Sequence, residues 1–144
     1  MYFCISFINF LHMKAFILRY PFSIAIILLV TFLSFFKPPK TDIDDVPGID
    51  KLVHTAMYFV MAGLLWLEFY RGQKKTNAPI WHAWIGAFLC PLIYGGVVEL
   101  LQQYCTEHRG GEWLDFAANS LGVILAAVAA TFILPKLLKK TKSQ

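Results

Sequence analysis

Four long apolar blocks, separated by short charged or proline-containing segments, constrain the fold of this 144-residue chain more than any other feature. Each block approaches the roughly 20 residues that an α-helix needs to cross the hydrocarbon core of a bilayer. A water-soluble domain of this length would intersperse its polar and apolar residues instead. The blocks predict an all-α integral membrane four-helix bundle, with helices over residues 15–36, 50–70, 79–104 and 113–134.

The N-terminal segment does not resemble a cleaved signal peptide, because bulky Phe35 and Phe36 stand where small residues would mark a cleavage site. Residues 1–14 are apolar but too short for another span. Since Met13 and Lys14 resemble a natural start, we expect this segment to be either the product of an upstream start codon or a short interfacial stretch. The membrane domain is expected over residues 15–134, followed by a basic cytoplasmic tail over residues 135–144.

The basic residues flank the apolar blocks and do not follow one amphipathic face, so the net charge of +4 does not indicate nucleic-acid binding. Most of them lie at the N-terminal flank, in the loop after residue 70 and in the tail. The positive-inside rule then places both termini in the cytoplasm. The loops at about 37–50 and 105–112 are expected to face outward.

Two further features concern helix packing. Pro91 is expected to bend the third helix, because proline cannot donate the backbone hydrogen bond of a helix interior. Small residues recur at every fourth position of the last block, which favours close packing inside the bundle over homodimerisation; they are Ala118, Gly122, Ala126 and Ala130. The three cysteines, at unrelated spacings, indicate neither a disulfide framework nor a zinc site.

Glu99 lies inside one of the most apolar stretches, where a lone charge is costly and is expected to face the bundle and to find partners. It would lie roughly 8–10 Å below the outer end of its helix. Polar residues of the second and fourth helices reach similar depths, and those of the second helix lie within an arc of about 100°. We therefore expect one outward-facing polar site formed by Asp50, Lys51, His54, Tyr58, Glu99, Gln102, Arg109, Asp115 and Asn119.

Taken one at a time, these residues also have structural interpretations. Asp50 could cap its helix, Asp115 could serve as a helix-start acid, and His54 could be a satisfied interior histidine. Glu99 and Asn119 could join helices without any chemistry. Their joint placement at one end of the bundle favours a functional cluster.

The ordered set Asp50-Lys51-x-x-His54-x-x-x-Tyr58, Glu99-x-x-Gln102, Arg109 and Asp115-x-x-x-Asn119-x-x-Gly122 resembles the VanZ-like family of small bacterial membrane proteins. The resemblance covers about two thirds of the chain. The connector before Trp113 departs from the apolar-Pro-Gly-Arg turn of the family, because it contains no proline. The resemblance implies a multi-pass protein of the bacterial cytoplasmic (inner) membrane and a family link to low-level teicoplanin resistance.

Three functions are consistent with these residues. The site could bind an anionic, lipid-linked or phosphorylated cell-envelope molecule or a cell-wall precursor, with positive charge from Lys51, Arg109 and protonated His54 and with Tyr58, Gln102 and Asn119 orienting it. It could be an enzyme in which Glu99 or His54 acts as acid or base and Arg109 stabilises negative charge. It could also be a structural or partner-binding protein. Membrane lipids are the expected surroundings; no cofactor is expected, and a hard-metal site is a less favoured alternative.

Overall fold

The computed structural model describes residues 17–36, 47–105 and 112–136, except for the side chains of residues 74–76. Within these ranges the protein is all-α and has no strand, as the apolar blocks predicted. In chain order the elements are α2 (Pro21–Phe35), α3 (Ile49–Thr76), α4 (Trp81–Ala83), η2 (Trp84–Leu89), α5 (Cys90–Cys105) and α6 (Trp113–Phe132).

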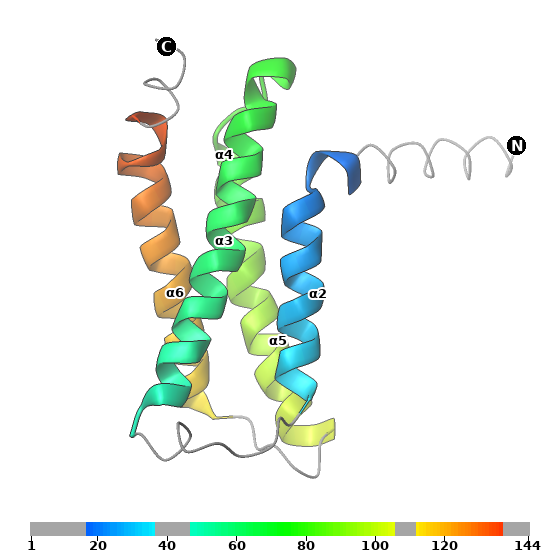
Figure 1. Ribbon diagram of the computed structural model, residues 1–144, viewed down its shortest axis with the longest axis vertical. Coiled ribbons are helices and arrows are strands. Elements are labelled where there is room, and N and C mark those ends of the chain that lie inside the picture. The colour runs from blue at the N-terminus through cyan, green and yellow to red at the C-terminus, as the bar shows by residue number, and fades with distance from the viewer. Residues whose placement is uncertain (1–16, 37–46, 106–111, 137–144) are drawn as a thin grey trace, which may run out of the picture.

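The helices lie side by side along the long axis of the molecule and alternate in direction (Figure 1). The segment formed by α4, η2 and α5 runs as one continuous helical rod opposite in direction to α3 and α6. As a result, the last turns of α2 and α5 and the first turns of α3 and α6 lie at the same end of the molecule. This arrangement brings together the polar residues that the sequence distributes over three separate helices.

Three helical segments are both long enough and apolar enough to cross a membrane: Ile49–Gln73, Trp81–Cys105 and Trp113–Lys136. Many of their large apolar side chains are exposed, including those of Leu52, Ile93 and Leu125, as expected for surfaces that contact lipid. The chain is therefore a membrane protein.

The first predicted helix is interrupted near its start. Where the sequence suggested a helix over residues 15–36, residues 17–19 are helical, Tyr20 forms a bend, and α2 extends over the 15 residues Pro21–Phe35. Pro21 explains the break, because proline restricts the residue before it and is favoured in the first helical turn.

Glu68 of α3 provides the cap that α2 lacks in its own sequence. Its carboxylate accepts hydrogen bonds from the backbone N–H groups of Phe22 and Ser23 at 3.0 and 3.1 Å, and from the Ser23 hydroxyl at 2.5 Å. A carboxylate at a helix N-terminus satisfies free N–H groups and interacts favourably with the helix dipole. This contact pins the start of α2 to the second half of α3.

α3 and α6 approach each other closely at Gly122. A Cβ atom on Gly122 would lie 2.3 Å from the carbonyl oxygen of Thr55. One turn earlier, the Thr55 hydroxyl donates a 3.1 Å hydrogen bond to the carbonyl oxygen of Ala118. The predicted small-residue stripe is buried along its whole length, which confirms that it packs inside the bundle; its members are Ala118, Gly122, Ala126 and Ala130.

The third predicted span contains a π-helical segment just before Pro91, the residue that was expected to bend it. The six residues Trp84–Leu89 form wider π-helical turns, and the N–H of Cys90 bonds to the carbonyl of Ile85, five residues earlier. Pro91 has no N–H for the regular bond to Ala87, so the altered register immediately before it accommodates the missing donor.

Candidate functional site

The first turns of α3 carry the side chains that the sequence placed on one face. His54 and Tyr58 are buried, with 5% and 1% of their surfaces exposed, whereas the Asp50 side chain is 55% exposed. Asp50 and His54 are four residues apart, so they lie one above the other on the same side of the helix. This face meets the start of α6 and the end of α5. We refer to Asp50, Lys51, His54, Glu99, Glu112, Asp115 and Asn119 as the polar cluster.

Lys51 is the centre of the charge pairing. Its Nζ atom lies 2.8 Å from Asp50 Oδ2, 2.8 Å from Glu112 Oε2 and 2.5 Å from Asp115 Oδ1. The first carboxylate belongs to α3, and the other two lie just before and within the first turn of α6. Lys51 therefore joins the two helix starts electrostatically. Its positive charge is balanced by carboxylates of the protein itself.

A hydrogen-bonded chain crosses three helices below Lys51. His54 Nδ1 of α3 lies 3.0 Å from Asn119 Oδ1 of α6, and Asn119 Nδ2 donates to Glu99 Oε1 of α5 at 3.2 Å. All three residues are buried. Buried polar groups are costly unless hydrogen-bonded, so the chain explains how the bundle tolerates them.

Among the described residues, Glu99 is surrounded by hydrogen-bond donors. Besides Asn119, the backbone N–H of Glu112 donates to Glu99 Oε2 at 3.3 Å. Lys51 pairs with three other carboxylates and not with Glu99. Arg109, another residue of the predicted site, lies outside the described residues.

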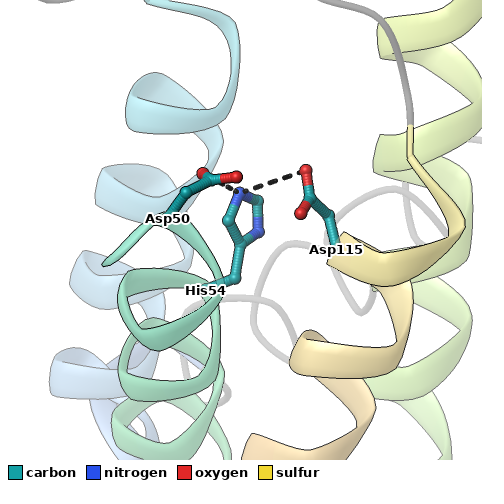
Figure 2. A group of neighbouring side chains, drawn as sticks. All are labelled: Asp50, His54 and Asp115. Atoms are coloured by element: carbon teal, nitrogen blue, oxygen red, sulfur yellow. Dashed lines mark ion pairs between the residues drawn. The ribbon is translucent and has the colours of Figure 1, made fainter. Parts of the chain in front are cut away.

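The imidazole of His54 points between two carboxylates (Figure 2). Its Nε2 atom lies 3.7 Å from Asp50 Oδ1 and 3.8 Å from Asp115 Oδ2. Both distances exceed those of a direct hydrogen bond. Asp50, His54 and Asp115 each offer one donor atom, and these atoms all lie within 4.8 Å of one another.

Two residues of the predicted site have other surroundings. Gln102 is buried, but its Nε2 donates to the carbonyl oxygen of Ser34 in α2 at 2.7 Å. The Tyr58 ring packs against Gly95, where a Cβ atom would lie 3.1 Å from the ring. Its buried hydroxyl has no hydrogen-bond partner among the described residues. Both lie beside the polar cluster, in positions that support helix packing.

Glu112 is a member of the cluster that the sequence reading missed. The sequence predicts only Arg109 as a site residue between the last two helices, yet the Glu112 side chain pairs with Lys51 and its N–H donates to Glu99. The spacing to Asp115, three residues later at the start of the same helix, is a signal that could have identified it.

A cavity of about 370 Å³ lies between α5 and α6 beside the cluster. Glu99 and Glu112 contribute its carboxylates, and apolar or aromatic side chains such as Leu100, Trp113 and Phe116 line much of the rest. The cavity thus combines a polar end with apolar walls. A larger cavity, of about 550 Å³, involves the other half of α3 and shares no residue with the polar cluster.

A scan against protein-family models, a search of curated proteins and a search of solved structures found no match to this chain. The resemblance to the VanZ-like family therefore stays a prediction from the ordered set of residues, and the function has to be inferred from the geometry of the site.

Proposed function

We propose that this chain is a VanZ-like protein of the bacterial cytoplasmic membrane that crosses the bilayer four times, with both termini in the cytoplasm. The distribution of basic residues supports this orientation. The apolar α2, which lies alongside the three longer segments, supports a fourth crossing together with the residues that flank it. In this orientation the polar cluster faces outward.

The proposed function is to bind or act on an anionic, lipid-linked or phosphorylated molecule of the cell envelope. One observation carries the proposal: the buried chain His54–Asn119–Glu99 lies next to a cavity with both polar and apolar walls. Such a cavity suits an amphipathic ligand, because the head group can meet the polar cluster while the lipid chain contacts apolar side chains. Polar residues buried in membrane proteins commonly mark substrate sites.

In a catalytic version of this function, Glu99 and His54 act as acid and base on the bound head group. Glu99 lines the cavity, and His54 is linked to Glu99 through Asn119. Protonation of one group therefore changes the electrostatic environment of the other. Arg109 is the proposed stabiliser of developing negative charge.

A structural role is the second candidate, and the pairing of Lys51 favours it. Three carboxylates from two helix starts surround this one ammonium group, which is the arrangement expected of a device that fixes helices against each other. In that case the cluster stabilises the bundle and no ligand is needed.

Complementation of a deletion strain separates these functions. Cells carrying the wild type, Glu99→Gln, His54→Ala or Arg109→Ala are compared for protein abundance in the membrane, teicoplanin susceptibility and the profile of lipids and cell-wall precursors. Thr131→Val, a substitution toward the opposite end of α6, is the control. We expect the three site variants to keep their abundance and to reproduce the phenotype of the deletion strain.

A covalently altered lipid or precursor that accumulates in both deletion and Glu99→Gln cells identifies the substrate and supports catalysis. If abundance falls in parallel with the phenotype, the structural role is supported instead. Stable and fully active site variants would contradict a functional role for the cluster.

A further inference from the structure

The tautomer of His54 follows from its neighbours. The Asn119 amide nitrogen faces Glu99 and donates to Oε1, so the amide oxygen, which only accepts, faces His54. His54 Nδ1 must therefore carry a proton to complete its 3.0 Å contact with that oxygen. In a neutral imidazole, Nε2 then has a free lone pair.

That lone pair points toward negative charge. Nε2 faces one oxygen of Asp50 and one of Asp115, at 3.7 and 3.8 Å (Figure 2). Neither contact is a hydrogen bond, and no hydrogen-bond partner of Nε2 occurs among the described residues. A lone pair that faces two carboxylates is unfavourable unless a proton, a water molecule or a metal ion lies between them.

The two aspartates are oriented for such a cation. Asp50 binds Lys51 through Oδ2 and Asp115 binds it through Oδ1, so Asp50 Oδ1 and Asp115 Oδ2 face His54. In each aspartate, Lys51 thus binds the oxygen that does not face His54. Asn119 binds His54 Nδ1, the imidazole nitrogen that does not face the two aspartates. Hydrogen bonds of this kind orient metal ligands in proteins.

We propose that Asp50 Oδ1, His54 Nε2 and Asp115 Oδ2 bind one divalent transition-metal ion of the Zn²⁺ and Mn²⁺ class. Imidazole nitrogen together with carboxylate oxygen suits these ions, whereas Mg²⁺ and Ca²⁺ favour oxygen alone. Ligand atoms at about 2.0–2.2 Å from a metal lie about 2.8–4.4 Å from each other, for angles at the metal between 90° and 180°. The separations of 3.7 and 3.8 Å fall within this range.

Charge supports the same assignment. Two aspartates neutralise a divalent ion, while Lys51 balances Glu112. Three protein ligands leave coordination positions open, as in catalytic metal sites. This inference deepens the proposed function and rests on it for the identity of the ligand. The Lys51 charge is already paired with three carboxylates, so an open metal position would supply the positive charge that binds a phosphate group.

Metal binding is measured on the full chain, stripped of metal and held in phosphatidylcholine nanodiscs. Mn²⁺ is titrated and the free ion is followed by electron paramagnetic resonance. We expect one saturable site per chain and a loss of affinity of at least about tenfold in His54→Gln and Asp115→Asn, since each removes a ligand. Glu112→Gln, which removes a charge of the same cluster but no ligand, should change the affinity by less than about threefold.

The wild type alone provides a second readout in case a variant does not fold. Bound Mn²⁺ should show hyperfine coupling to one imidazole nitrogen in pulsed electron paramagnetic resonance. Absence of a saturable site, absence of this coupling, or an equal loss of affinity in Glu112→Gln would each overturn the metal assignment.

Addition of farnesyl phosphate to the Mn²⁺-loaded protein separates the metal site from the proposed function. Coupling between Mn²⁺ and phosphorus supports both. If the nitrogen coupling is present without phosphorus coupling, the metal site stands and its role in binding a phosphorylated lipid is contradicted.

Discussion

At the scale of single residues, Asn119 decides how the buried polar groups are arranged. Its amide is the one side chain of the described cluster that contacts both His54 and Glu99, and each contact uses a different atom of the amide. An amide can accept and donate at the same time, whereas a carboxylate accepts only. Asn119 therefore orients two ionisable groups from two other helices without adding a charge.

Replacement of Asn119 by alanine should leave His54 Nδ1 and Glu99 Oε1 without the hydrogen bonds that the amide makes. Because a buried polar group that loses its hydrogen bond costs about 1–3 kcal/mol, we expect the free energy of unfolding to fall by about that amount. Unfolding in mixed detergent micelles measures the change.

Ser120→Ala is the matched control on the same helix, because the Ser120 hydroxyl bonds only to the carbonyl of Phe116 one turn earlier among the described residues. It should alter the free energy of unfolding by less than about 1 kcal/mol. Equal losses in the two variants would show that the amide does not join the helices.

At the scale of elements, the contact between α3 and α6 sets the geometry of the site. Gly122 permits the backbones to touch, and Asn119 precedes it by three residues on α6. On the opposing helix, Thr55 receives the close contact and His54 is its neighbour in sequence. The His54–Asn119 hydrogen bond therefore depends on a backbone approach that only a residue without a side chain allows.

Gly122→Ala should separate the two helices. Its Cβ atom would overlap the Thr55 carbonyl, and backbone atoms cannot move aside as the end of a flexible side chain can. We expect a loss of about 1–3 kcal/mol in the free energy of unfolding and weaker Mn²⁺ binding.

Gly63→Ala is the control, because no atom lies within 4 Å of a Cβ at this position of α3. It should be neutral or stabilise the protein by up to about 1 kcal/mol, since alanine favours helix more than glycine does. A neutral Gly122→Ala variant would contradict the close approach.

At the scale of the whole molecule, the alternating direction of the helices places the ends that carry polar residues at one end of the bundle (Figure 1). The charges there are concentrated in the first turns of α3 and α6, while the basic flanks belong to the opposite ends of the apolar segments. In the proposed orientation, this arrangement places the polar cluster on the outer side of the membrane.

Cysteine labelling tests this orientation. Cys105 is exposed at the end of α5, close in sequence to the proposed outward loop. In a chain with Cys4→Ser and Cys90→Ser, a membrane-impermeant maleimide should label Cys105 in intact cells. In a second chain, with all three native cysteines replaced and Gln144→Cys added, it should label the tail only after permeabilisation. The reverse pattern would invert the proposed topology.

The accuracy of the sequence-based prediction differs from one helix to another. Apolar block length correctly predicted helices in all four regions, because backbone polar groups in a bilayer must be satisfied within the helix. The first helix was predicted to be continuous but is interrupted at Tyr20, since Pro21 breaks it and the cap of α2 comes from Glu68, which is distant in sequence. The small-residue stripe was correctly assigned to the bundle interior, because four-residue spacing places it on one helix face.

The sequence by itself determined that the protein is helical, that it belongs in a membrane, and that acidic, basic and amide residues gather toward the same ends of three helices. It did so because burial of the backbone in lipid and helical periodicity are local properties. The pairing was decided by the tertiary structure: Lys51 with three carboxylates, Glu99 with Asn119 and the Glu112 backbone, and His54 between Asp50 and Asp115. Which oxygen faces which nitrogen depends on how closely two helices approach and how each is rotated, and these depend on contacts such as that of Gly122 with Thr55, made between residues far apart in the chain.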